Sequence, residues 1–333
     1  MKTGAIPKVS VVMGVYNGGR FLREAVESIL GQTFEDFEFL IINDASTDDS
    51  AEIMEHFSDP RIRIYENSRN EGLTRCLIKG CNEARGKYIA RMDADDISYP
   101  MRFEKQVAFL EGHQEYAVIG TQCHFLDDIG KVRAISAYFC TDEELKQDVW
   151  RRAPFAHGAT MFVREHIMEF GGYRELFRYA QDYDLWLRVM ERCKVANLPD
   201  VLYGLRYHRK SITLQNFYLQ AQFGDLAREF AQMRAKTGSD PITRGDIELA
   251  QAKIESWHTN GLLRSMGIRS ERAMQLLDFM VAWGKLSDIF AIWLAALCNN
   301  PLNGKVWRFL LSDSLRLCLK GAVTGGLRPG ERE

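Results

Sequence analysis

The chain has 333 residues, of which 46% are hydrophobic and 26% are charged, and this balance is typical of a mostly globular protein. Its net charge of −2 and its lack of long basic blocks exclude the electrostatic footprint of a nucleic-acid-binding protein. The seven cysteines are scattered without C-x-x-C pairs, and no apolar signal region precedes the first strand pattern, so we expect a cytoplasmic chain with reduced thiols and no structural zinc site.

Strand and helix patterns alternate along the chain as far as residue 92. Apolar β-branched runs predict strands, and apolar residues at helical spacing predict helices. In chain order we predict strand 8–16, helix 21–30, strand 37–42, helix 51–57, strand 61–66, helix 72–85 and strand 88–92. This order predicts an α/β fold with a doubly wound mixed sheet.

Polar residues follow three of the predicted strands, namely Tyr16-Asn17, Asn43-Asp44 and the acidic run at 93–96. Ligands of doubly wound sheets bind outside the carboxyl ends of the strands, so these residues should meet at one edge. Each has a simpler reading, because Asn17 could form only a turn, and Asp44 with residues 46–50 could only cap the next helix. Their coincidence with the acidic run favours a nucleotide-shaped crevice.

The acidic run Asp93-Ala94-Asp95-Asp96 places three carboxylates within four positions. Carboxylates this close repel one another unless a cation or buried donors hold them, and hard divalent cations suit such a cluster. A solvated acidic turn before Pro100 is the alternative reading of this segment. Neither G-x-G-x-x-G nor G-x-x-x-x-G-K-[ST] occurs, so we expect a metal rather than a glycine-rich loop to meet phosphate charge.

Residues 7–215 resemble the large inverting family of nucleotide-sugar glycosyltransferases with the A-type, Rossmann-like fold. The resemblance depends on five segments in matching order and spacing: 9–17 (VSVVMGVYN), 29–33 (ILGQT), 41–48 (IINDASTD), 70–73 (NEGL) and 88–96 (YIARMDADD). It implies that Asp44 accepts a hydrogen bond from the nucleobase and that Asp93 faces the ribose and diphosphate. The other nucleotide contacts that it implies come from Val15, Tyr16 and Asn17.

The same resemblance implies that Asp95 holds Mn²⁺ or Mg²⁺. His208, in the segment 206–213, matches a family position that completes the metal site or contacts the diphosphate, although a surface histidine is an equal alternative. His157 aligns with a segment on the acceptor side, where a structural histidine is equally compatible with the sequence. The chain departs from many relatives at Asn43 and Ile78, and we assign neither a catalytic role.

The best candidate for a general base is Asp182, in the run Gln181-Asp182-Tyr183-Asp184. The apolar residues that follow predict a helix, and its first turn favours a carboxylate. An isolated aspartate there would be only a helix cap, but the family motif at this place implies a base. Gln181 stands where Glu is common, and Asp184 is the second candidate, on the sugar-contacting or acceptor side.

We expect two domains, a catalytic one at 1–215 and a helical region at 216–333. The apolar segment 271–298 has no uncharged run that reaches the roughly twenty residues of a membrane-spanning helix. It is either a buried bundle helix or a surface that docks on the inner face of a membrane or on a second subunit, as in a homodimer.

Together these features imply a metal-dependent inverting glycosyltransferase that uses a nucleoside-diphosphate sugar, with uridine as the first expectation for the base. The acceptor would be a hydroxyl of a glycan or lipid-linked glycan in cell-surface polysaccharide synthesis. A catalytically inactive carbohydrate-binding or scaffold protein is the alternative, and Asp93, Asp95 and Asp182 disfavour it. A nucleotidyltransferase ranks lower, because the segment 16–20 is a poor triphosphate-binding loop.

Overall fold

The computed structural model describes residues 6–208 and 211–259. Its strands are β1 (Val9–Val15), β2 (Phe37–Asn43), β3 (Ile62–Glu66), β4 (Tyr88–Asp93), β5 (Ile97–Ser98), β6 (Tyr116–Leu126), β7 (Val132–Ile135), β8 (Met161–Val163) and β9 (Lys194–Arg206). Its helices are α1 (Gly19–Leu30), α2 (Ser50–Glu55), α3 (Leu73–Glu83), α4 (Arg102–Gly112), α5 (Asp142–Asp148), the 3₁₀ turn η1 (His157–Ala159), α6 (Arg164–Glu169), α7 (Gln181–Met190), α8 (Ile212–Thr237) and α9 (Ile247–Thr259).

The strands form one sheet in the order β3-β2-β1-β4-β8-β6-β9-β5, with β7 paired to β6. β1 runs parallel to β2 and β4, and Val15 is paired with Asn43 while Gly14 is paired with Asp93. The carboxyl ends of these three strands therefore lie side by side. β8 pairs antiparallel with β4 and β6, which makes the sheet mixed and confirms the predicted fold class.

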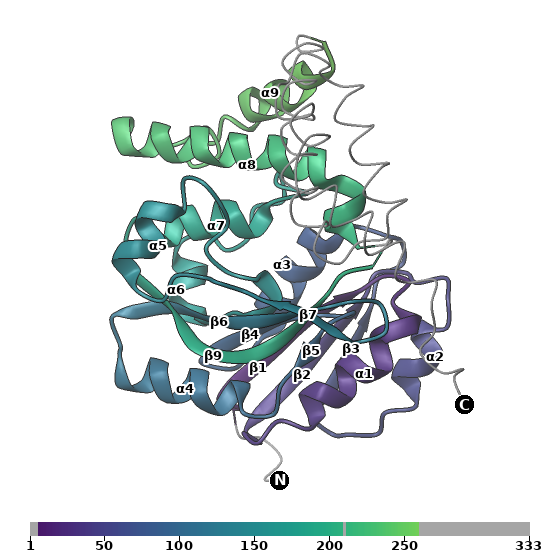
Figure 1. The fold of residues 1–333 in the computed structure, drawn as a ribbon. Helices are drawn as coiled ribbons and strands as arrows, with labels where there is room; N and C mark the ends of the chain where they lie inside the picture. Colours follow the sequence, from purple (N-terminus) through teal and green to yellow (C-terminus); the bar gives the residue numbers. More distant parts are fainter. Residues whose placement is uncertain (1–5, 209–210, 260–333) are drawn as a thin grey trace, which may run out of the picture. The chain divides into compact units, whose positions relative to one another are not determined.

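Helices cover both faces of the sheet, with α1, α2 and α4 on one face and α3 and α7 on the other (Figure 1). Side chains of β1 alternate between the faces, so that Val11 and Met13 join the core under α1 and α4. Val12 points to α3, where a Cβ on Gly80 would lie 2.4 Å from the Val12 Cγ1 atom. A glycine at this position therefore lets α3 lie directly on the sheet.

Glu38 lies near the start of β2, at the opposite end of this strand from the predicted site. It connects β2 with β1, with β3 and with the loop before β4. Its buried carboxylate accepts hydrogen bonds from Ser10 Oγ (2.7 Å), Arg63 Nη1 (2.8 Å), and Arg85 N and Nε (both 2.8 Å). Burial raises the pKa of Glu38, but the hydrogen bonds from Arg85, Ser10 and Arg63 outweigh it and lower the pKa below its ordinary value.

We expect Glu38→Gln to lower the free energy of unfolding by about 2 kcal/mol at pH 7, since a buried charge-assisted network loses its anion. A carboxyl with a lowered folded pKa stabilises the fold above its unfolded pKa, so the difference from wild type should shrink as the pH falls below that value. Urea unfolding at several pH values measures this difference. Glu55→Gln, at an exposed position of α2, should change stability by less than about 0.5 kcal/mol, and an equal loss in both variants would contradict the assignment.

The described residues belong to two compact units, one made of 6–208 with 223–238 and the other of 211–222 with 239–259. Within the first unit, the Phe177 ring packs on Phe223 and Phe230 of α8, with centroids 6.1 and 6.0 Å apart. Helix α8 departs from helical geometry at Asn216, which belongs to the second unit. The expected boundary at residue 215 stays a prediction.

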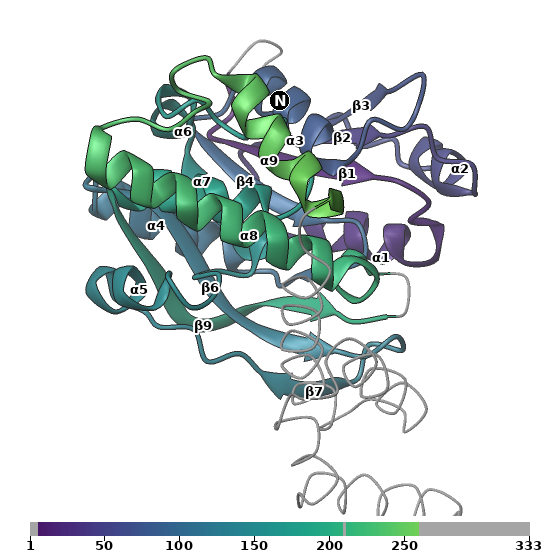
Figure 2. The same cartoon turned by 90° about the horizontal axis from the view of Figure 1, so that it is seen from above.

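Figure 2 shows α8 and α9 from above, and the apolar segment 271–298 lies outside the described residues, so its predicted docking role stays untested. Within the described ranges, no helix combines the length and the apolar character that a membrane crossing requires. Among the described residues, the cysteines at 76, 81, 123, 140 and 193 form no disulfide.

Candidate functional site

The loop after β1 is tied to the loop after β2. The Asn17 backbone N–H donates to Ser46 Oγ (3.1 Å), and Asn17 Oδ1 accepts from the Thr47 N–H (2.8 Å). Asp48 accepts from the Gly19 N–H at Oδ2 (3.0 Å), while Asp49 takes the N-cap position of α2 without a side-chain capping bond. The polar residues that the sequence suggested as helix caps therefore mainly join the two loops.

Asp44, at the end of β2, is buried and organises the loop before α3. Its Oδ1 accepts from Asn67 Nδ2 (2.8 Å) and the Glu71 N–H (2.9 Å), and its Oδ2 accepts from the Gly72 N–H (2.8 Å). A carboxylate has about four acceptor sites, so these bonds leave room for one more donor.

Val15 and Tyr16 present different groups at this edge of the sheet. The Val15 side chain lies in the core, and its carbonyl accepts from the Asp44 N–H at 2.8 Å. The Tyr16 ring is 52% exposed and is therefore available to a ligand, whereas Val15 offers only its backbone.

Asp93 is held from within the sheet by Arg91, whose guanidinium has no exposed surface. Arg91 Nη2 donates to Asp93 Oδ1 at 2.5 Å, and Nη1 donates to the Val12 carbonyl at 3.1 Å. Burial raises the pKa of Asp93; the Arg91 charge opposes this shift, and the Asp95 charge adds to it.

Asp95 and His208 face each other although they lie far apart in the sequence. His208 Nε2 is 2.9 Å from Asp95 Oδ2, and both side chains are partly exposed. A carboxylate oxygen and an imidazole nitrogen are suitable ligands for Mn²⁺, and for Mg²⁺ the carboxylate is the usual protein ligand. Across the described part of the chain, no group of three or more potential metal ligands converges, so phosphate oxygens and water would have to complete such a site. The pair fits a divalent cation on those terms.

Gly158, in η1, lies directly against the Asp93 carboxylate. A Cβ at this position would be 2.8 Å from Asp93 Oδ2 and 2.1 Å from the Tyr203 hydroxyl. That hydroxyl is buried, donates to Asp96 Oδ2 (2.8 Å) and accepts from the Asp93 N–H (3.3 Å). The absence of a side chain at 158 therefore lets η1 lie directly against Asp93 and Tyr203.

Asp182 lies in the first turn of α7 and keeps part of its side chain exposed. Desolvation raises its pKa to about 6, although hydrogen bonds from the Tyr183 and Asp182 N–H groups lower it. The charge of Asp93 adds to the rise and the charge of Arg91 opposes it, so Asp182 belongs to the same electrostatic cluster as the end of β4. A carboxylate with a pKa near 6 can accept a proton at neutral pH.

His157 lies beside this cluster and contacts Tyr173. Its Nε2 is 2.7 Å from the Tyr173 hydroxyl. Desolvation and the Arg91 charge lower the pKa of His157 well below its ordinary value, so the imidazole is neutral at pH 7. Burial raises the pKa of Tyr173 well above its ordinary value, and the charges of Asp182 and Asp93 add to the rise.

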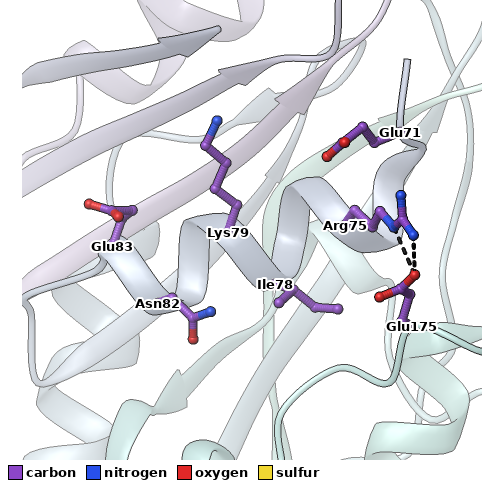
Figure 3. Close-up of a pocket in the computed structure, with 7 residues that line it drawn as sticks. All are labelled: Glu71, Arg75, Ile78, Lys79, Asn82, Glu83 and Glu175. Carbon is purple, nitrogen blue, oxygen red and sulfur yellow. Dashed lines mark hydrogen bonds and ion pairs between the residues drawn. The ribbon is translucent and has the colours of Figure 1, made fainter. Parts of the chain in front are cut away.

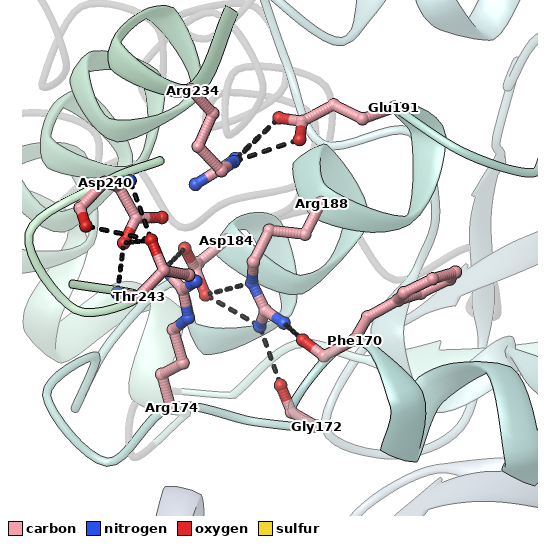
Figure 4. A network of polar contacts seen from close by, with 9 residues as sticks. All are labelled: Phe170, Gly172, Arg174, Asp184, Arg188, Glu191, Arg234, Asp240 and Thr243. Atoms are coloured by element: carbon pink, nitrogen blue, oxygen red, sulfur yellow. Dashed lines mark hydrogen bonds and ion pairs between the residues drawn. The ribbon is translucent and has the colours of Figure 1, made fainter. Parts of the chain in front are cut away.

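Asp184 presents no atom to solvent. Its Oδ2 accepts from Arg188 Nε (3.1 Å) and Nη2 (2.8 Å), and Arg188 also donates to the Gly172 carbonyl at 2.7 Å, as Figure 4 shows. Arg174 Nη1 lies 3.6 Å from Asp184 Oδ1. Asp184, the second candidate for the base or a sugar contact, is therefore enclosed by arginines. Through Arg188 it holds the 170–172 loop against α7.

A shallow hollow of about 380 Å³ lies on the outer face of α3 (Figure 3). Its charged groups are partnered, since Arg75 pairs with Glu175 and Lys79 donates to Asn67 Oδ1 at 2.8 Å. Glu71 and Lys79 connect this hollow with Asp44, the first directly and the second through Asn67. Because its charged groups are already partnered, we do not place the reaction there.

Among residues 6–208 and 211–259, three non-glycine residues adopt a left-handed backbone, and each adjoins the predicted site. They are Asn17 (φ 52°), Ala45 (φ 57°) and Ala180 (φ 52°). This conformation costs about 1–2 kcal/mol for a residue with a Cβ, and such strain gathers at functional sites. The three positions flank the loops that follow β1 and β2 and the start of α7.

Comparison with known proteins identifies the family of this chain. The model of the family "Glycosyl transferase family 2" matches residues 10–171. The EpsE protein of Bacillus subtilis strain 168, whose name assigns it to the glycosyltransferases, is 40% identical over 219 residues, which are 62% of this chain and 77% of EpsE. The chain belongs to glycosyltransferase family 2. The amylovoran biosynthesis glycosyltransferase AmsE of Erwinia amylovora is 32% identical over 203 residues, covering 59% of this glycosyltransferase and 75% of AmsE.

Two solved structures share the fold of this glycosyltransferase. Residues 1–349 of Staphylococcus aureus TarS, in complex with UDP-GlcNAc, align with a TM-score of 0.55 and 15% identity over 88% of this chain and 89% of that chain. The mannosyltransferase PcManGT of Pyrobaculum calidifontis, in complex with GDP-Man and Mn²⁺, aligns with a TM-score of 0.52 and 18% identity over 96% and 87%. At these identities the likeness shows the A-type fold alone.

Several residues that build the candidate site were missed in the sequence. Arg91 has a local signal, since a charge inside an apolar strand pattern is unusual and calls for a partner. Gly158 and Tyr203 have none, because their roles depend on contacts with residues distant along the chain.

Proposed function

We propose that this family 2 glycosyltransferase transfers a sugar from a UDP-linked donor to a hydroxyl of a glycan or lipid-linked acceptor in cell-surface polysaccharide synthesis. The observation that supports it best is that Asp93 and Asp95 lie at and just after the carboxyl end of β4, with His208 against Asp95, and that the Asp93 charge acts on Asp182 in the first turn of α7. The complex of TarS with UDP-GlcNAc and the name of AmsE suggest the donor and the pathway, respectively.

In the proposed reaction the acceptor oxygen attacks the anomeric carbon while the bond to the diphosphate oxygen breaks on the opposite side. Asp182 takes the acceptor proton, and the nucleoside diphosphate leaves with the bonding electron pair. Asp44 and Tyr16 contact the nucleobase, and Asp93 orients the ribose and diphosphate.

Asp95 and His208 would hold Mn²⁺ or Mg²⁺, as PcManGT holds Mn²⁺ with its own donor. When bound, the cation neutralises charge on the leaving diphosphate, so that no protein acid is needed there. We place His157, with Tyr173, on the acceptor side of the site.

The test is a panel of UDP-, GDP- and dTDP-sugars, measured by thermal shift and by release of nucleoside diphosphate, with and without Mn²⁺. We expect UDP-sugars to raise the melting temperature only when Mn²⁺ is present, because Asp95 and His208 would hold the cation that neutralises the charge of the diphosphate. Stabilisation by GDP-sugars alone would contradict our assignment of a uridine nucleotide as the donor. No stabilisation by any donor would favour a scaffold protein that has kept the family fold.

A further inference from the structure

Arg206, the last residue of β9, binds the acidic run at 93–96. The Arg206 N–H donates to Asp96 Oδ1 (2.7 Å), and its Nε donates to the Asp95 carbonyl oxygen (2.9 Å). Its Nη2 donates to Glu24 Oε2 of α1 at 2.5 Å. The guanidinium thus connects β9, the loop after β4 and helix α1.

Phe21 of α1 lies beneath both Arg206 and His208. The Arg206 guanidinium carbon is 4.6 Å from the Phe21 ring centroid, and the His208 ring centroid is 4.9 Å from it. Phe21 and Glu24 are three residues apart on α1 and therefore share one face of this helix. On that face the Phe21 ring packs against Arg206 and His208, and the Glu24 carboxylate accepts a hydrogen bond from Arg206.

Arg206 is itself poorly placed to bind a donor. Its side chain is only 3% exposed, whereas the His208 and Asp95 side chains are 14% and 31% exposed. The two more exposed groups can reach a ligand. Arg206 lies behind them: it binds the Asp95 carbonyl, and its own backbone is two residues before His208.

We propose that Phe21, Glu24 and Arg206 are positioning residues that hold His208 against Asp95 in the geometry of a divalent-cation site. This inference rests on the proposed function, which assigns the cation to that pair. Groups behind metal ligands fix the ligand orientation, and their loss typically weakens metal affinity about 10–100-fold.

A network that only stabilised the fold would act differently. Its loss would lower the melting temperature without changing the cation affinity of the molecules that remain folded. The two roles can therefore be separated by measuring stability and cation binding on the same variants.

The experiment compares Glu24→Gln and Arg206→Lys with the control Glu27→Gln, an exposed position on the same helix. Mn²⁺ binding is measured by electron paramagnetic resonance of the free ion, with UDP or GDP present and no sugar transfer. We expect the Mn²⁺ dissociation constant to rise about tenfold in Glu24→Gln and Arg206→Lys and to stay unchanged in Glu27→Gln. The melting temperature of ligand-free Glu24→Gln should stay near that of wild type, because the Glu24 side chain is 54% exposed.

His208→Ala separates this inference from the proposed function. Mn²⁺ binding that weakens in His208→Ala but not in Glu24→Gln or Arg206→Lys would overturn the positioning role alone. Wild-type protein that binds no Mn²⁺ with either nucleotide, or binding that His208→Ala leaves intact, would overturn the metal assignment and the inference with it.

Discussion

Asp182→Asn is expected to lower the rate of sugar transfer by about two to four orders of magnitude while leaving donor binding nearly intact, the usual result of removing a general base. The wild-type rate should fall as the pH drops through about 6, because the protonated carboxyl can no longer accept the acceptor proton. The variant should lack this acid limb. Release of nucleoside diphosphate on both sides of pH 6 measures both effects.

The same variant distinguishes a base from a helix cap by its stability. The folded pKa of Asp182 lies above its ordinary value, so ionisation in the folded protein opposes folding, and this penalty is present in full above about pH 6. Asp182→Asn should therefore be more stable than wild type above that pH, and the difference should vanish when the pH falls below the ordinary value of 3.8. A simple cap would give the opposite sign.

The matched control is Asp36→Asn, which changes an exposed carboxylate outside the site. It should leave both rate and stability near their wild-type values. Near-normal turnover in Asp182→Asn would show that another group removes the proton.

Gly158→Ala should lower kcat/KM about 10²-fold, because displacement of reacting groups by as little as about 1 Å has effects of this size. The new methyl group would overlap the Tyr203 hydroxyl and press on Asp93 Oδ2. Neither can yield freely, since Tyr203 is buried and bonded to Asp96, and Arg91 holds Asp93. Overpacking should also lower the free energy of unfolding by about 1–3 kcal/mol.

Steady-state kinetics and urea unfolding test this prediction together. Gly112→Ala, at the end of α4, is the control, because a Cβ there meets no atom within 4 Å. If Gly158→Ala kept wild-type activity and stability, the position of the acidic run would not depend on η1.

The N-terminal half of the sheet could be predicted because its strands are local. Each of β1, β2 and β4 is a mostly apolar run, and their ends differ from the predicted ends by at most one residue. The parallel order then placed Asn17, Asp44 and Asp93 at one edge without any knowledge of side-chain contacts. The short strands β5, β7 and β8 were not predicted, since two to four residues carry too little periodicity.

By itself, the sequence determined the fold class and the acidic residues at the sheet edge, because apolar periodicity and β-α order depend on neighbours along the chain. Only the tertiary structure decided which of Asp182 and Asp184 is accessible, since arginines buried around α7 enclose the second. It also decided that His208 faces Asp95, a contact that spans 113 residues. Such contacts form when β9 pairs with β5 and β6, and no local pattern of residues encodes that pairing.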